Sequence, residues 1–141
     1  VFITYNSDPY GLFMIKCKDD VCSDYSGSTS ISEMYTGWYN NMYPINANQI
    51  LCIYYNNQTF SLEYSLYNIT QNKVVGYNVI AFNVHGGWLD STEINSTALA
   101  LVYVDLTTNA YIYSECVINK TRFDMNCIPT IIDINITDYS N

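Results

Sequence analysis

The chain repeats itself at a spacing of 49 residues. Three seven-residue segments superpose without gaps, and they begin at Val1 (VFITYNS), Ile50 (ILCIYYN) and Leu99 (LALVYVD). The following apolar segments keep the same register, which aligns Phe13 with Leu62 and Tyr111, and Ile15 with Tyr64 and Tyr113. A shared block precedes the second and third copies: Gly37-Trp38 with Ile45-Asn46, and Gly87-Trp88 with Ile94-Asn95. Self-similarity at this period predicts one small structural unit per copy.

Each copy has the pattern of short strands. In the middle copy we expect strands at about 38–45, 49–55, 60–68 and 74–84. The third of these alternates, with Leu62, Tyr64 and Leu66 on one face, and this places Glu63 on the other face, toward solvent. Turn-forming pairs separate the segments, among them Gly86-Gly87 directly after His85. No sustained helical period is present.

We therefore predict one all-β domain over residues 1–141, built from repeats at about 1–36, 37–86 and 87–141. Four strands in such a length are typical of a β-propeller blade. A two-sheet β-sandwich is the alternative fold. The 15 tyrosines and the abundance of β-branched residues favour strands as well.

The charge balance excludes several kinds of partner. Charged residues make up 13% of the chain and the net charge is -8. So few lysines and arginines argue against nucleic acid and against an anionic membrane surface. No apolar run approaches the roughly 20 residues that span a bilayer, so membrane insertion is not expected.

Sequons and cysteines indicate a secreted protein. Five cysteines in a short chain are typical of oxidising compartments. Five sites read Asn-X-Ser/Thr and are the predicted glycosylation sites: Asn57, Asn68, Asn95, Asn119 and Asn135. We expect an extracellular location, or the surface of a cell or virion.

One family resemblance follows from the repeat. The Gly-Trp…Ile-X-Tyr-Tyr-Asn pattern, followed by a strand that ends in Lys-Cys with a second Cys shortly after, resembles a β-propeller-type repeat of secreted bacterial and protist proteins. The best match runs from Ile3-Thr4-Tyr5-Asn6 to Lys16-Cys17 and Cys22. The resemblance implies propeller blades, distantly like those of sialidases, and transfers no catalytic residue. The middle copy lacks both cysteines of the motif.

The repeat alignment also predicts the disulfides. Cys17 and Cys22 follow one strand of the first copy, and Cys116 and Cys127 occupy the matching place in the third. We predict these two pairs as disulfides, each closing a turn. Cys52 aligns with Ile3 and Leu101, so we expect it to be unpaired in the core. An intermolecular disulfide is the alternative for Cys52.

The sequence offers little for catalysis, so we predict a non-enzymatic protein without cofactor or metal. A sialidase-type site needs clustered arginines, whereas this chain has only Arg122. The acidic residues are scattered rather than paired as a glycosidase needs, and His85 has no evident nucleophile partner. Asp19, Asp20 and Asp24 could bind Ca²⁺, but their spacing does not match an EF-hand loop.

The predicted function is self-association. The first copy lacks a Gly-Trp strand ahead of Val1, so we expect residues 1–6 to pair on one side only and to accept a strand from outside the chain. Exposed aromatic residues also suit protein interfaces and sugar stacking. The predicted interface residues are Val1, Phe2, Ile3, Tyr5, Trp38, Tyr39 and Trp88. We expect a structural or adhesive glycoprotein that assembles with copies of itself or with adjacent repeats of a longer parent, in a ring or a filament; a glycan- or receptor-binding attachment module is the alternative.

Overall fold

The protein is all-β. A computed structural model describes residues 1–7, 11–32, 36–119, 122 and 124–134, although the side chains of residues 87, 88, 133 and 134 are outside the description. Eleven strands and no helix are present in this part of the chain. The strands are β1 (Phe2–Ser7), β2 (Gly11–Cys17), β3 (Tyr25–Ser30), β4 (Thr36–Asn46), β5 (Gln49–Asn56), β6 (Ser61–Asn68), β7 (Lys73–Ala81), β8 (Val84–Asn95), β9 (Ala98–Asp105), β10 (Ala110–Asn119) and β11 (Asp124–Ile134).

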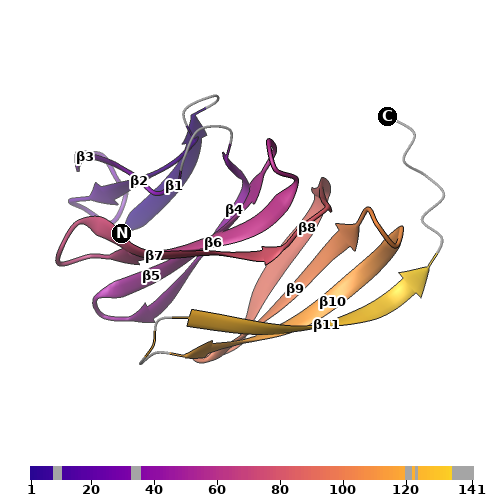
Figure 1. Cartoon of the computed structure of the whole chain (residues 1–141). Coiled ribbons are helices and arrows are strands. Elements are labelled where there is room, and N and C mark those ends of the chain that lie inside the picture. Colours follow the sequence, from indigo (N-terminus) through magenta and orange to yellow (C-terminus); the bar gives the residue numbers. More distant parts are fainter. Residues whose placement is uncertain (8–10, 33–35, 120–121, 123, 135–141) are drawn as a thin grey trace.

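The strands form three separate antiparallel sheets, each a simple meander. Their orders are β1-β2-β3, β4-β5-β6-β7 and β8-β9-β10-β11, and the sheets succeed one another across the molecule (Figure 1). A two-sheet sandwich therefore does not describe this fold. In the short connections after β6, β7 and β9, the residues Asn72, Asn83 and Asn109 adopt positive φ, which asparagine tolerates well.

Strand pairing shows how closely the copies agree. Cys52 lies opposite Ser65 in the second sheet, and Leu101 lies opposite Ser114 in the third, so the two registers differ by 49 at both positions. In the first sheet Ile3 lies opposite Ile15. Pairing thus makes Ile15 the counterpart of Ser65, and likewise Phe13 the counterpart of Glu63. Our alignments of Ile15 with Tyr64 and of Phe13 with Leu62 are therefore both wrong by one residue. The physical reason is the hairpin connection, which has three residues between β1 and β2 but four between β5 and β6.

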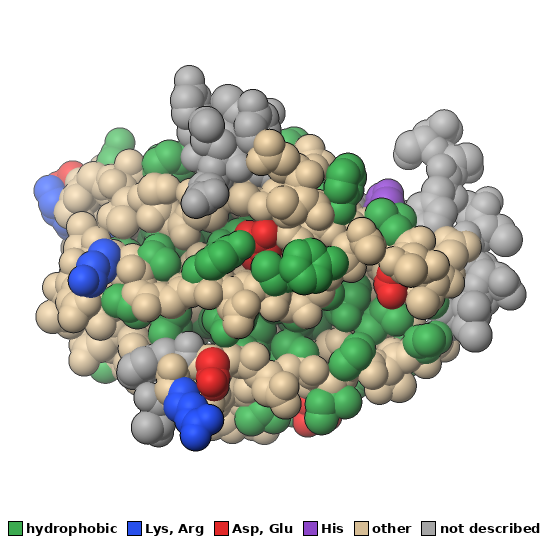
Figure 2. All heavy atoms as spheres, viewed as in Figure 1, with side chains coloured by type: hydrophobic (Ala, Val, Ile, Leu, Met, Phe, Trp, Pro, Cys, Tyr) green, Lys and Arg blue, Asp and Glu red, His purple; other side chains and the backbone are tan. Residues whose placement is uncertain are grey.

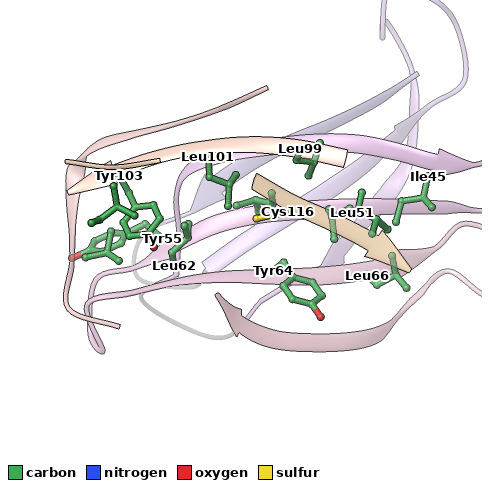
Figure 3. Close-up of a cluster of buried hydrophobic side chains, with 14 of the residues drawn as sticks. Ile45, Leu51, Tyr55, Leu62, Tyr64, Leu66, Leu99, Leu101, Tyr103 and Cys116 are labelled. Carbon is green, nitrogen blue, oxygen red and sulfur yellow. The ribbon is translucent and has the colours of Figure 1, made fainter. Parts of the chain in front are cut away.

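The second sheet lies between the other two, which explains why nearly all of β5 and β6 is buried. One cluster of buried side chains fills the space between the second and third sheets (Figure 3), and it includes Leu51, Leu62, Leu99 and Leu101. A second cluster lies between the first and second sheets and contains Leu12, Met14, Ile31, Ile50, Cys52, Tyr54 and Tyr67. The visible surface has few charged side chains, and hydrophobic ones lie among uncharged polar ones (Figure 2).

Polar contacts also hold the sheets together. Between the first and second sheets, the Thr4 hydroxyl donates to the side-chain Oδ1 atom of Asn40 at 2.5 Å. Between the second and third sheets, the Tyr43 hydroxyl and the Asn41 amide both donate to the hydroxyl of Ser91, at 2.6 and 2.7 Å. These buried groups are therefore paired across the layers rather than left without partners.

The glycine of the first Gly-Trp pair is required by packing. Gly37 has a φ of 91°, and a Cβ atom there would lie 2.5 Å from the Cβ of Leu12 in the first sheet. The Gly86-Gly87 pair behaves differently from our expectation, since it lies within β8 rather than in a turn. Gly86 is instead covered by the ring of Tyr55, which would be 2.3 Å from an added Cβ.

Candidate functional site

The cysteines pair as the repeat alignment predicts. Cys17 and Cys22 form a disulfide that closes the segment after β2. Cys116 and Cys127 form the other, but they lie directly opposite each other within β10 and β11 rather than across a turn. Cys52 is free and has no exposed surface, and burial raises the pKa of its thiol to about 12. Two disulfides fit an oxidising compartment.

The outer face of the first sheet is exposed, although the residues at the equivalent repeat positions of the second and third sheets are buried. We call this surface the first outer face, and it contains Val1, Ile3, Tyr5, Phe13 and Ile15. Ile3 is 40% exposed, whereas its counterparts Cys52 and Leu101 are fully buried. Tyr5 stacks on Phe13 with ring centroids 5.6 Å apart, so aromatic surface is gathered there. The difference in burial arises because the second and third sheets have a neighbour on this side and the first sheet has none among the described residues.

The third sheet has a comparable surface on its far side. We call it the third outer face, and its apolar residues are Ile94, Ala100, Val102, Tyr113, Val117 and Ile128. They surround the exposed Glu115, which lies opposite Ala100 and Ile128 in the sheet. Val102 is the counterpart of Ile53, which packs against the third sheet, and its cross-strand partner is Tyr113. Val117 and Ile128 are both more than half exposed. The molecule therefore presents exposed apolar side chains on an outer face at each end of the series of sheets.

The sheet edges agree with the predicted pairing of residues 1–6. Within the described residues β1 has β2 as its single ladder partner, so its second edge is open. At the other end of the series, β11 is an edge strand that exposes Ile131 and Ile132. Open apolar edges are templates for pairing with further strands.

A pocket of about 300 Å³ opens between the second and third sheets. We call it the aromatic pocket. Its lining residues are Trp38, Tyr39, Tyr55, Asn57, Phe60, His85, Gly86 and Leu106. Trp38, Tyr39 and Phe60 are each exposed over a substantial fraction of their surface. Flat aromatic side chains with accessible faces suit sugar rings and apolar groups.

Two of these aromatic residues have an unusual backbone. Tyr39 has a φ of 49° and Phe60 a φ of 54°, in the left-handed region that bulky side chains rarely occupy. Tyr39 lies where the pairing of β4 with β5 shifts register, and Phe60 lies just before β6. Such strained positions cluster at binding sites. Both side chains nevertheless remain about half exposed, so core packing does not account for their conformation.

Glu63 is buried, contrary to our expectation of a solvent-facing side chain. It is 3% exposed because the first sheet covers the face of β6 that carries it. Its Oε1 atom accepts hydrogen bonds from the Ser61 hydroxyl at 2.6 Å and from the Asn56 amide at 3.0 Å. The side-chain Oδ1 atom of Asn56 in turn accepts bonds from the backbone N–H groups of Gln58 and Thr59. Glu63 thus fixes the turn that follows β5.

A second pocket of about 400 Å³ lies beside Glu63, between the first and second sheets. Its lining is Ser30, Ile31, Ser32, Thr36, Tyr54, Asn56, Glu63, Ser65, Val74 and Tyr77. Among the described lining residues Glu63 is the one carboxylate. Burial raises the pKa of Tyr54, whose hydroxyl is 2.8 Å from that of Ser65, so this phenol stays neutral at physiological pH.

The remaining sequence-predicted residues are distributed over several places. Phe2 packs edge-on against Tyr67 inside the molecule, and the side chain of Trp88 lies outside the description. The sequon residues Asn57 and Asn95 lie in or beside turns, as do Asn68 and Asn119, whereas Asn135 lies outside the described residues. Sequence reasoning missed Phe60 and Leu106, because no periodicity marks a residue that reaches a pocket from a turn.

The acidic loop has a structural explanation. Asp19 accepts hydrogen bonds from the backbone N–H and the hydroxyl of Ser23, and these bonds lower the pKa of its carboxyl. Asp24 forms an exposed ion pair with Lys18 at 2.8 Å. Over the described residues no three His, Cys, Asp or Glu side chains are grouped as a metal site.

Comparisons with known proteins leave the family open. No protein family model matches the chain, and neither a curated protein nor a solved structure matches it significantly. Nothing in these comparisons bears on the resemblance to propeller repeats. In the part of the chain that the structure describes, no helix is long and apolar enough to cross a membrane. The fold defines an all-β repeat protein, and its distinctive surfaces are the two outer faces and the aromatic pocket.

Proposed function

We propose that this protein is a non-enzymatic extracellular glycoprotein, a structural or adhesive subunit that self-associates through its two outer faces. Its sheets act as consecutive propeller-like blades, and the third outer face of one copy packs on the first outer face of the next. In a longer parent chain the neighbouring repeat would fill the same place.

The observation that carries this proposal is the contrast in burial at equivalent repeat positions. Inside the molecule, Cys52 packs on the first sheet and Leu101 packs on the second, and both are fully buried. Ile3 holds the same position on the first outer face and is 40% exposed. Terminal units of repeat proteins usually present a polar face that keeps them soluble alone. The two outer faces instead expose apolar side chains, with Glu115 among those of the third face, and this favours a further sheet as their partner.

The two faces are different surfaces, so their contact is heterologous. A heterologous contact joins copies head to tail and produces a closed ring or an open filament, depending on the rotation between neighbours. The low charge of the chain supports close packing, although the net charge of -8 opposes it at low salt.

Complementation between two blocked variants tests the proposal. Ile3→Glu places a charge on the first outer face, and Val102→Glu places one on the third. Sedimentation should show the unmodified protein as an oligomer and each variant alone as a monomer, because every contact needs one first and one third outer face. An equimolar mixture should form 1:1 dimers, because each variant retains the face that the other has lost.

The outcomes separate the possible arrangements. If the unmodified protein is a monomer at high concentration, self-association is wrong. If both variants still form the same oligomer, the outer faces are not the contact. Glu93→Gln, an exposed change on β8, serves as the control that should leave the oligomer intact.

A further inference from the structure

We infer that the aromatic pocket holds a sugar that is attached to this chain itself. This sugar is the first N-acetylhexosamine of a glycan linked to Asn57. This inference rests on the proposal that the chain is a secreted glycoprotein, and it adds where one sugar packs.

The position of Asn57 is the first step. Its sequon, Asn57-Gln58-Thr59, occupies the turn between β5 and β6, and the Asn57 side chain lines the aromatic pocket. Asn57 is exposed, and among the described residues its side chain has no hydrogen bond. The lining of this pocket includes none of Asn68, Asn95 and Asn119. A sugar linked to Asn57 therefore begins at the pocket rather than over open solvent.

The lining of the pocket is the second step. Trp38 and Phe60 present large apolar faces that suit the C–H groups of a pyranose ring, and exposed aromatic surface of this kind is costly if left uncovered. Tyr39 and Phe60 both hold positive φ values, so the backbone keeps these rings at the surface in place of more favourable conformations. The volume of about 300 Å³ is at the lower end of the range for small-ligand pockets, which is consistent with one or two sugar units.

The rigidity of the turn is the third step. The side-chain Oδ1 atom of Asn56 accepts hydrogen bonds from the backbone N–H groups of Gln58 and Thr59 at 2.9 and 3.1 Å, and its Nδ2 donates to buried Glu63. The Thr59 hydroxyl is 2.6 Å from that of Ser61. The attachment point is thus ordered before any sugar is added, so packing the sugar on the aromatic rings sacrifices little backbone entropy.

The test uses the full chain secreted from eukaryotic cells, with matched variants Asn57→Gln and Asn68→Gln. Glycopeptide mapping should find Asn57 occupied. In NMR spectra, the acetyl methyl protons of the sugar at Asn57 should be shifted upfield by the aromatic rings, and those at Asn68 should not. Trp38→Ala should remove much of that shift while the glycan stays attached.

Thermal unfolding gives a second readout. Asn57→Gln should lower Tm by about 3 °C, the size of shift expected for about 1 kcal/mol in a chain of this length. Asn68→Gln should leave Tm unchanged, and enzymatic trimming of all glycans to a single sugar should preserve the stabilisation.

Failure of this inference differs from failure of the proposed function. The proposed location of the sugar is wrong if Asn68 or Asn95 carries glycan while Asn57 is bare, or if the methyl shift at Asn57 equals that at Asn68. Either result leaves the proposal of a secreted glycoprotein unaffected. If the chain as secreted, with its native Asn57, is bare at that residue and its pocket binds free N-acetylglucosamine, the pocket serves an external sugar and our inference is overturned. If no sequon is occupied, the glycoprotein assignment fails together with the proposed location of the sugar, while sedimentation still decides self-association.

Discussion

Ile45 and Ile94 hold the same repeat position 49 residues apart, yet Ile45 is 6% exposed and Ile94 is 48% exposed. The strand pairing around both residues is the same, with an equivalent register shift in β4 and β8. Ile45 packs against the third sheet, whereas Ile94 belongs to the third outer face. Local structure is therefore shared, and the presence of a neighbouring sheet decides burial.

This pair makes a direct comparison of substitutions possible. Ile45→Asp should reduce the free energy of unfolding by more than about 3 kcal/mol, because it buries an unpaired charge. Ile94→Asp should change it by less than about 0.5 kcal/mol under dilute, monomeric conditions. Urea unfolding of both variants measures the difference, and equal losses would contradict the assignment of Ile94 to a free face.

The two disulfides should differ in their contribution to stability. Cys116 is fully buried and its bridge closes the longer loop, with a sequence separation of 11 against 5 for Cys17–Cys22. Replacing Cys116 and Cys127 by Ala should cost about 3 kcal/mol, and replacing Cys17 and Cys22 should cost less. Chemical denaturation of the two double variants checks this order, which a reversed ranking would disprove.

Cys52 should be protected and should make stability sensitive to alkaline pH. Its thiol pKa is raised from 9.0 to about 12 by burial, so the folded protein keeps a proton that the unfolded chain loses. The stabilisation is fully present below pH 9 and is lost as the pH rises toward 12, at up to about 1.4 kcal/mol per pH unit. Unfolding of the native protein and of Cys52→Ala between pH 8 and 10 should show the steeper decline in the native protein.

The same burial predicts an unreactive thiol. A thiol reagent should leave Cys52 unmodified in the folded protein and should label it fully in urea. Rapid labelling of the folded protein would mean that Cys52 is accessible, and it would favour the alternative prediction that Cys52 forms an intermolecular disulfide.

Glu63 should be important for stability without taking part in chemistry. Glu63→Ala leaves the Asn56 amide and the Ser61 hydroxyl without their acceptor in a buried place, so we expect a loss of about 2 kcal/mol. Glu63→Gln keeps an acceptor oxygen and should cost less. Glu93→Gln, at an exposed position, should have no measurable effect on urea unfolding. If Glu63→Ala is neutral, the hydrogen bonds to this carboxylate do not stabilise the turn.

Gly37 should tolerate no side chain. Gly37→Ala combines a φ of 91° with a Cβ only 2.5 Å from that of Leu12, so it should cost about 3 kcal/mol or more. Gly27 has a φ of 83° but no atom within 4 Å of an added Cβ, so Gly27→Ala measures the backbone cost alone. The difference between the two in thermal unfolding reports the contact between the first and second sheets, and equal effects would rule that contact out.

The sequence by itself determined the elements and their pairing. The 49-residue period, the alternation along β6 and the polar turns are local properties, so they predicted the strands of the middle copy and both disulfides. The same reasoning failed at Ile15, because one residue fewer in a hairpin connection changes the strand register without altering the apolar pattern.

Only the tertiary structure decided which faces are covered. An alternating strand specifies two faces but not what lies against each, so Glu63 was expected in solvent and is buried under the first sheet. The aromatic pocket likewise brings Trp38 of β4 to the same cavity as Phe60 from a turn and Leu106 after β9, and these residues are far apart along the chain. Burial and pocket formation depend on how sheets stack, which is a long-range property that the repeat pattern of one strand does not contain.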